Sequence, residues 1–226
     1  MNKMKNLNNN YSILSTHSKN KLIIDYLNEV FPNPKCELEY SNLFELLIAV
    51  MLSSQTLDRR VNEVTKVLFS KYPTVNNLYN ADFNDLENLL KPLGLAKTKA
   101  SNIKNICADL INNYNGEVPT SFNDLTSLKG VGEKTAQVVM IEGLNQKAFP
   151  VDTHVLRVSK RLGLVEENIN ATSASKKLKE IFPDDLWNKL HQQMVLFGRY
   201  HCLAKKPKCD NCKLNQICKY LKNDKE

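Results

Sequence analysis

The chain has 226 residues, of which 42% are hydrophobic, and its 31 lysines and arginines against 24 acidic residues give a formal net charge of +7. This length suits one large domain or two small ones, with enough apolar residues for a buried core. The longest apolar stretch, Leu46 to Leu52, is too short to cross a bilayer, and no secretory signal opens the chain. We therefore expect a cytoplasmic protein, whose basic excess favours a nucleic acid or another anionic partner.

The sequence predicts an all-α protein of about ten helices. Residues 1–18 are polar and are expected to form a disordered tail. From Lys19 onward apolar residues recur at three- and four-residue steps, and β-branched residues nowhere alternate with polar ones for long. Short connections rich in Gly, Pro and Asn separate the helical runs. The predicted helices cover residues 22–30, 43–51, 61–72, 83–90, 97–113, 134–143, 155–162, 173–181 and 186–197.

Residues 125–143 have the pattern of two helices joined by the tight turn Gly130-Val131-Gly132. The two glycines permit positive φ angles and let a phosphate approach the backbone where no Cβ stands in the way. The second helix begins at the turn, so its unpaired N–H groups and positive dipole end face whatever docks there. A helix-ending glycine with a tight turn is also common in helical proteins. The complete pattern favours binding of DNA phosphates, without sequence preference.

Two residues near this hairpin are candidates for catalysis. Lys134 stands in the first turn of the second helix, where the helix dipole opposes its charge, and a neutral lysine amine can form a Schiff base with an aldehydic carbon. Asp152 precedes the next helical run, where its carboxylate would cap the helix or stabilise positive charge on a sugar ring. Each also has an ordinary interpretation, as a surface lysine and as an N-cap, and their spacing in sequence does not bring them together.

The chain has six cysteines, and in a reducing cytosol these do not predict disulfides. Cys36 and Cys107 are interpreted as core thiols. The other four follow C-x6-C-x2-C-x5-C spacing and can wrap one metal centre, for which zinc and an iron–sulfur cluster are both suitable: Cys202, Cys209, Cys212 and Cys218. Basic side chains between them indicate a polyanion nearby: Lys205, Lys206 and Lys208.

Three motifs, in this order, resemble the endonuclease III family of bacterial base-excision-repair enzymes: LKGVGEKTA at residues 128–136, VDTHVLRV at 151–158 and the four-cysteine loop. Further matches lie at residues 44–50 and 53–56, so the resemblance covers most of the chain. It implies a bifunctional DNA glycosylase and abasic-site lyase. Such an enzyme removes oxidised pyrimidines from duplex DNA through a lysine Schiff base and β-elimination.

The resemblance also implies roles for individual residues. Lys134 matches the family's nucleophilic lysine and Asp152 its catalytic aspartate, while the four cysteines match the ligands of a 4Fe–4S cluster. Gln55 matches the residue that fills the gap left by the extruded nucleotide, and Leu95 a wedge inserted into the opposite strand. Taken alone, Gln55 is an exposed helix-end amide and Leu95 a core leucine. Further DNA contacts are expected from the hairpin turn and the cluster-loop lysines: Gly130, Val131, Gly132, Lys205, Lys206 and Lys208.

The family resemblance further implies two helical domains flanking a DNA-binding cleft. A continuous six-helix module at residues 37–146 would carry the helix-hairpin-helix, and residues 19–36 with 147–226 would form a discontinuous domain with the cluster loop at 202–218. The catalytic lysine and aspartate would face each other across the mouth of the cleft. No motif calls for more than a monomer, and a bacterial enzyme of this kind is expected in the cytoplasm, associated with the nucleoid.

One departure and three alternatives remain. Lys129 stands where the family usually has proline, which adds a charge, frees a backbone N–H and puts the rigidity of the hairpin in question. The related adenine glycosylases share the hairpin, the aspartate and the cysteine loop but generally lack the lysine, so Lys134 argues against that monofunctional activity. A non-catalytic DNA-binding module with a metal loop predicts that Lys134→Ala keeps both DNA affinity and biological activity. A redox sensor predicts that the state of the cluster switches DNA binding.

Overall fold

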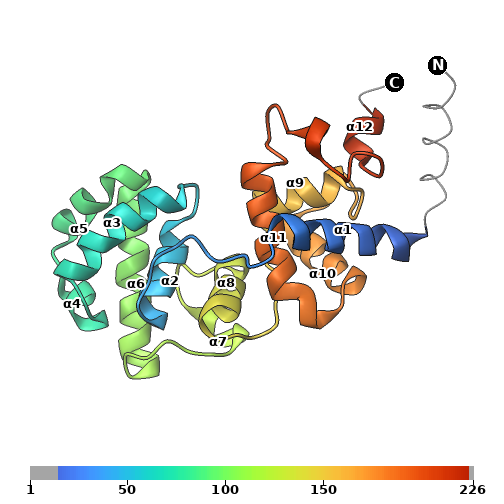
Figure 1. Cartoon of the computed structure of the whole chain (residues 1–226). Coiled ribbons are helices and arrows are strands. Elements are labelled where there is room, and N and C mark those ends of the chain that lie inside the picture. The colour runs from blue at the N-terminus through green and yellow to red at the C-terminus, as the bar shows by residue number, and fades with distance from the viewer. Residues whose placement is uncertain (1–14, 224–226) are drawn as a thin grey trace, which may run out of the picture. The chain divides into compact units, whose positions relative to one another are not determined.

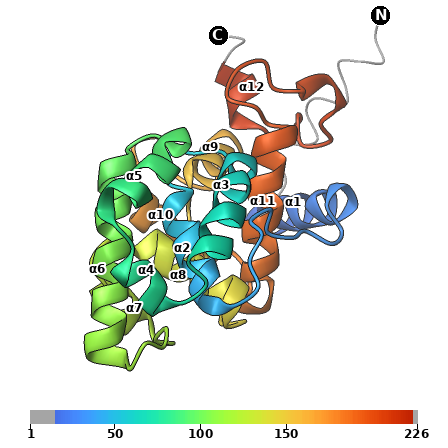
Figure 2. The same cartoon turned by 90° about the vertical axis from the view of Figure 1, so that its left-hand side faces the viewer.

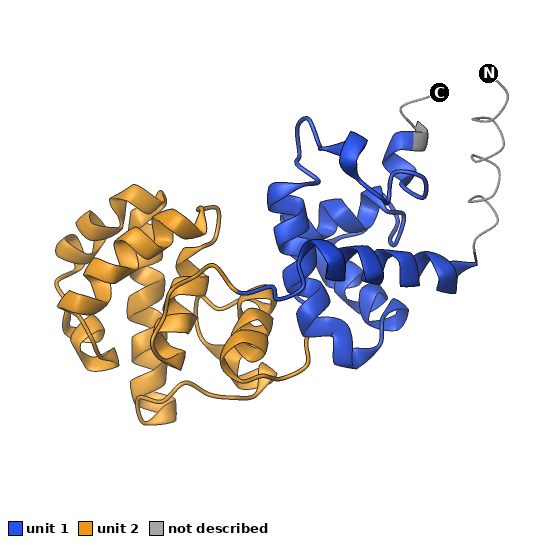
Figure 3. Cartoon of the chain, in the orientation of Figure 1, with its two compact units in different colours: residues 1–35, 149–226 blue, residues 36–148 orange. Residues whose placement is uncertain are grey.

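The computed structural model describes residues 15–223, and all regular secondary structure within this range is helical (Figure 1). The predicted fold class is therefore confirmed. The chain divides into two compact units, unit 1 with Met1–Lys35 and Phe149–Glu226, and unit 2 with Cys36–Ala148 (Figure 3). These boundaries lie within a few residues of the predicted domain limits at 36/37 and 146/147.

Unit 2 has seven α-helices where the sequence predicts six. The additional helix is α4, whose six residues are too short to show a helical period but whose N-cap Thr74 accepts a hydrogen bond from Asn77 N at 3.1 Å. The elements are α2 (Leu43–Leu52), α3 (Asp58–Lys71), α4 (Val75–Asn80), α5 (Phe83–Leu90), the 3₁₀ turn η1 (Lys91–Leu93), α6 (Ala96–Tyr114), α7 (Phe122–Ser127) and α8 (Glu133–Gly143).

Helix α2 is the central helix of unit 2. Every residue from Leu46 to Leu52 is buried, and α2 packs against α3, α6 and α8. A short helix that is apolar on all sides belongs inside a protein core. Helices α4 and α5 lie along α6 (Figures 1 and 2). Within residues 15–223, no helix has the length and hydropathy required to cross a membrane.

Unit 1 combines the N-terminal helix with the C-terminal third of the chain. Helix α11 packs against α1 and α9, and Phe197 and Met194 on α11 are buried in the core of this unit. The elements are α1 (Thr16–Val30), α9 (Thr153–Arg161), α10 (Ala171–Ile181), the 3₁₀ turn η2 (Asp184–Leu186), α11 (Trp187–Tyr200), the 3₁₀ turn η3 (Cys209–Asn211) and α12 (Lys219–Asn223).

The prediction of a disordered tail at residues 1–18 is wrong for its last four residues. Ser15 is the N-cap of α1, and its Oγ accepts a hydrogen bond from Ser18 N at 3.2 Å. Residues 15–18 therefore form the cap and first turn of α1, because a serine at this position satisfies an N–H group that the helix leaves unpaired. Residues 1–14 lie outside the described residues.

The two isolated cysteines contribute to the core of unit 2. Cys107 is fully buried on α6, and burial raises the pKa of its thiol to about 12. Cys36 is partly buried and packs against the same core. Both thus behave as the sequence predicts for structural thiols.

Candidate DNA-binding and catalytic site

The helix-hairpin-helix consists of α7, the turn at 128–132 and α8. Ser121 caps α7 by accepting from Asp124 N at 3.1 Å, and the turn closes with a hydrogen bond from Val131 N to Leu128 O at 3.0 Å. Leu128 and Val131 are buried, so the turn is anchored in the core of unit 2. No side chain caps the N-terminus of α8. A helix N-terminus of this kind suits an anionic ligand, because its N–H groups point outward along the helix axis.

The two hairpin glycines differ in backbone conformation and in the space available for a side chain. Gly130 has φ +101°, and a Cβ built there would lie 2.9 Å from Asn102 Cγ. Gly132 has φ −89°, which any residue adopts, and no atom lies within 4 Å of its virtual Cβ. The expectation of a positive φ is therefore right for Gly130 and wrong for Gly132. The fold itself therefore does not require glycine at position 132.

Lys129, which stands where the family usually has proline, uses the backbone N–H that proline would lack. This N–H donates a hydrogen bond of 2.9 Å to Asp109 Oδ2 on α6. The side chain of Lys129 is exposed. The substitution thus replaces the conformational restriction of proline by a bond that ties the hairpin to α6.

Lys134 lies at the second position of α8, immediately after the hairpin turn, and it is exposed. Among the described residues it has no hydrogen-bond or ion-pair partner. The amine is thus accessible to a substrate.

Asp152 is the N-cap of α9, as the sequence predicts. Its Oδ1 accepts a hydrogen bond from Val155 N at 2.8 Å, and the residue is partly buried. The cap fixes the carboxylate in one orientation, and the second carboxylate oxygen remains for another partner. Asp152 belongs to unit 1 and Lys134 to unit 2. That the two side chains face each other stays a prediction.

Helix α9 is held closely against α11. A Cβ on Gly198 of α11 would lie 2.8 Å from His154 Cβ, so only glycine permits this approach. Arg157 Nη2 donates to Gly198 O at 2.7 Å and lies 3.2 Å from His154 Nδ1. Burial lowers the pKa of His154, while the charge of Asp152 acts in the opposite direction. The neutral imidazole therefore predominates at cellular pH beside the Asp152 cap.

The four cysteines predicted as ligands lie together in unit 1. They line one pocket of about 370 Å³, part of it open to solvent, between the ends of α9 and α11 and the loop that follows: Cys202, Cys209, Cys212 and Cys218. None forms a disulfide. Within residues 15–223, no three His, Cys, Asp or Glu side chains converge closely enough to hold a single metal ion. The thiols nevertheless provide the donor type that an iron–sulfur cluster requires.

The cysteine loop is fastened to α9 by two arginines that the sequence analysis did not identify. Arg157 Nε donates to Cys202 O at 3.1 Å, and Arg161 Nη1 donates to Leu203 O at 2.6 Å and to Cys202 Sγ at 3.4 Å. Their spacing of four residues places both on one face of α9. An Arg-x3-Arg pair after the VDTHVL motif was the available signal, but surface arginines produce the same pattern.

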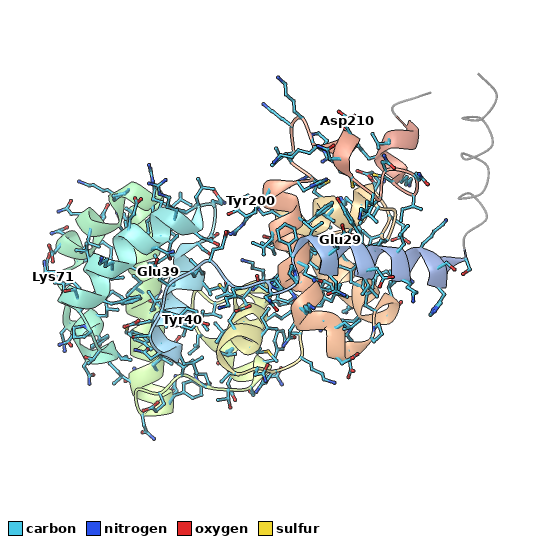
Figure 4. The ribbon with its side chains drawn as sticks, viewed as in Figure 1. Glu29, Glu39, Tyr40, Lys71, Tyr200 and Asp210 are labelled. Atoms are coloured by element: carbon cyan, nitrogen blue, oxygen red, sulfur yellow. The ribbon has the colours of Figure 1, made fainter. Side chains whose placement is uncertain are left out.

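Helix α1 fastens the other side of the same loop. Tyr26 OH donates to Asn211 O at 3.2 Å. Lys213 Nζ forms an ion pair with Glu29, which is labelled on α1 in Figure 4, at 2.7 Å from Oε2. The ion pair is exposed and contributes little by itself. The three loop lysines are exposed: Lys205, Lys206 and Lys208. Lys206 has a positive φ of 52°. They have the accessibility that contact with phosphates requires.

Gln55 and Leu95 occupy two turns of unit 2. Gln55 follows α2 and is exposed with φ 56°, and Leu95 is the N-cap of α6 with φ 50° and ψ 35°. The interpretation of Leu95 as a core leucine is wrong, because 59% of it is exposed. Its left-handed backbone turns the side chain out of the core, which periodicity of apolar residues does not reveal.

Comparison with known proteins identifies relatives along most of the chain. The family model described as HhH-GPD superfamily base excision DNA repair protein matches residues 48–184. The endonuclease III of Bacillus subtilis (strain 168) is 41% identical over 87% of this chain and 90% of that relative. The endonuclease III of Rickettsia felis is also 41% identical, over 88% of this chain and 94% of that relative.

Solved structures agree with this result. A non-covalent endonuclease III–DNA complex aligns with a TM-score of 0.90 and 42% identity, covering 94% of this chain and 99% of that one. A trapped endonuclease III–DNA covalent intermediate aligns with a TM-score of 0.91 and 42% identity, covering 95% and 100%. A thermostable thymine-DNA glycosylase, at 23% identity and a TM-score of 0.83 over 92% and 99% of the two chains, shares the fold.

Proposed function

The chain belongs to the endonuclease III family of the HhH-GPD superfamily, and from this premise we propose that it is a bifunctional DNA glycosylase and abasic-site lyase. Its substrate is duplex DNA that contains oxidised pyrimidines or abasic sites, in the bacterial cytoplasm. The observation that carries the proposal is Lys134, an exposed lysine without a partner among the described residues, in the first turn after a hairpin suited to phosphate binding.

The proposed reaction begins with extrusion of the damaged nucleotide from the stack, which costs a few kcal/mol. Gln55 and Leu95 occupy the vacated space. The neutral amine of Lys134 attacks C1′, and the C1′–N bond breaks so that the base leaves with the bonding electrons and takes up a proton. Asp152 supplies a fixed carboxylate that balances the positive charge developing on the sugar.

Strand cleavage follows from the covalent intermediate. Opening of the sugar ring leaves an imine between Lys134 Nζ and C1′, and its electron-withdrawing character acidifies the C2′ hydrogen. Loss of that proton breaks the C3′–O bond and expels the 3′ phosphate. Water then hydrolyses the imine and restores the lysine. An amine nucleophile therefore accounts for both activities, whereas an activated water would release the base only.

We further propose that the four-cysteine loop holds a 4Fe–4S cluster. The support is the set of four thiols that line one pocket in unit 1, within a loop fastened by Arg157, Arg161 and α1. Four cysteine ligands suit such a cluster. The cluster, when bound, supplies cross-links that fold the loop, and the lysines of the loop then present their charges to the DNA backbone.

The test of the proposed function is product analysis on a duplex with a single thymine glycol. We expect release of the free base together with cleavage on the 3′ side of the lesion, leaving an unsaturated aldehyde on the 3′ end. The same duplex with an undamaged thymine is the control and should stay intact. Base release with intact strands would contradict the bifunctional reaction, and absence of both products would contradict the proposed function as a whole.

The hairpin glycines provide a test of phosphate binding. Gly132→Ala should leave the free energy of unfolding unchanged to within about 0.5 kcal/mol, because neither φ nor space opposes a Cβ. The added methyl group stands in the path of the phosphate, so the affinity for duplex DNA should fall about tenfold. Urea unfolding and fluorescence anisotropy with a labelled duplex measure the two effects.

Gly130→Ala is the matched control for this variant. Its positive φ and the close Asn102 side chain should cost about 1–3 kcal/mol of stability. If Gly132→Ala instead lowers stability and leaves DNA affinity unchanged, the turn has a structural role only.

The identity of the metal centre can be measured directly. We expect protein purified without oxygen to contain four iron atoms and to absorb visible light, and Cys212→Ser to lose most of this iron. The variant should bind duplex DNA more weakly, because the loop lysines lose their fixed positions. Cys36→Ser, outside the loop, should keep the iron. Stoichiometric zinc without iron would contradict the cluster.

A further inference from the structure

Lys99 is a buried lysine that the proposed chemistry does not use. It is 4% exposed in α6, and burial lowers the pKa of its amine. Its Nζ donates to Thr56 Oγ1 at 2.7 Å and to Leu93 O at 3.0 Å. No described carboxylate forms an ion pair with it. A buried ammonium held only by neutral oxygens costs stability compared with an apolar side chain, so stability does not explain its presence.

The hydrogen bonds of Lys99 connect two turns that are far apart in sequence. Thr56 lies in the turn between α2 and α3, and its hydroxyl donates to Leu93 O at 2.8 Å, beside the start of α6. Arg60 Nη1 adds a bond of 3.3 Å to Pro92 O. The hydroxyl thus accepts from Lys99 while it donates to the carbonyl that Lys99 also contacts. These bonds fix the two turns to each other.

Each of the two turns contains a residue in the left-handed region of backbone conformation. Gln55 precedes Thr56, and Leu95 follows Leu93 by two positions. Asparagine tolerates this region, as at Asn115 and Asn145, but glutamine and leucine adopt it only at an energetic cost. Because Gln55 and Leu95 are both exposed, burial of their side chains does not offset this backbone strain. Strain of this kind persists where neighbouring bonds hold it and is common at functional sites.

We infer that Lys99 is a positioning residue, which holds the two turns together so that Gln55 and Leu95 project as a preformed pair into the duplex. The inference rests on the proposed function, in which these side chains fill the space left by the extruded nucleotide. Lys99 itself makes no contact with DNA and acts through Thr56 and the Leu93 carbonyl. Fixing both turns beforehand avoids the entropy loss of ordering them when the nucleotide leaves the stack.

The test compares two single-turnover rates of the 226-residue chain carrying Lys99→Met, which keeps the length of the side chain and removes its donors. Base release from a thymine glycol duplex requires extrusion of a stacked nucleotide, whereas an abasic nucleotide leaves the stack at lower cost. Base release should fall roughly tenfold or more, and cleavage at a preformed abasic site should stay close to the native rate. Stability in urea should be unchanged or higher, since an apolar side chain replaces a buried cation.

Lys104→Met is the matched control. Lys104 lies on the same helix, burial also lowers the pKa of its amine, and its Nζ donates to the carbonyl oxygens of Tyr79 and Ala81. These bonds lie away from the turns that carry Gln55 and Leu95, so both rates should stay native. Thr56→Val should reproduce the defect of Lys99→Met, and the double variant should lose much less than the product of the two single losses, since both variants break one network.

The outcomes separate the inference from the proposed function. If Lys99→Met slows base release and abasic cleavage by the same factor, or slows neither, Lys99 does not position the pair and the inference is overturned. If the native protein acts on neither duplex, the proposed function fails, and the inference fails with it. Selective loss of base release with retained stability and strictly native behaviour of Lys104→Met supports the inference.

Discussion

Replacing Lys134 by alanine is expected to lower the rates of base release and of strand cleavage at least about a thousandfold, because the variant has no amine to form the covalent intermediate. The fold should not respond, since the side chain is exposed, has no partner among the described residues and occupies a helical position that suits alanine. Stability should stay within about 0.5 kcal/mol of the native value. Single-turnover kinetics and urea unfolding measure the two quantities.

Lys129→Ala is the appropriate control for Lys134→Ala. It removes a second exposed lysine of the same hairpin and keeps the backbone N–H that donates to Asp109. At saturating DNA its rates should be close to native, with a small loss of affinity at low salt from the missing charge. Equal losses in the two variants would mean that Lys134 contributes charge and not a nucleophile. A native rate in Lys134→Ala would mean that another group forms the covalent intermediate.

Asp152 allows catalysis and helix capping to be separated by two substitutions. Asp152→Asn keeps an oxygen that accepts from Val155 N, and asparagine caps helices as well as aspartate does, so stability should be retained. The loss of the negative charge should slow base release about 10²- to 10⁴-fold. Asp152→Ala should show the same kinetic loss and also lower stability by about 1 kcal/mol, because the cap bond disappears.

The comparison of the two aspartate variants has a clear contrary outcome. If Asp152→Asn keeps a nearly native rate while Asp152→Ala loses both stability and activity, the residue acts through the orientation of α9 alone. The rate should be measured at saturating DNA, so that a change in affinity does not appear as a change in chemistry.

Those parts of the site that depend on local sequence were accessible before the structure. The helix-hairpin-helix at 125–143 follows from two helical runs around a glycine turn, and the capping role of Asp152 follows from its place before a helix. Both features are set by residues within a few positions of each other, where hydrogen-bond requirements of helix ends decide the outcome. The four-cysteine pocket was likewise predictable from spacing within one loop.

Features that depend on distant contacts were not accessible in this way. No local signal gives Gln55 or Leu95 a left-handed backbone, because the restraint comes from Lys99, which lies 43 residues from its partner Thr56. The same holds for Arg157 and Arg161, whose partners are carbonyl groups of the cysteine loop more than 40 residues away. The need for glycine at position 198 likewise becomes evident only from its close contact with His154. Side chains that position a site through tertiary contacts therefore require the structure.

The central claim is that Lys134 forms a covalent imine with the damaged nucleotide, and borohydride trapping tests it most directly. Borohydride reduces the imine to a stable amine, which links the protein to the DNA. With a thymine glycol duplex, native protein should yield a covalent adduct that peptide mapping assigns to Lys134, and Lys134→Ala should yield none. Base release without an adduct, or an adduct mapped to another residue, would contradict the claim.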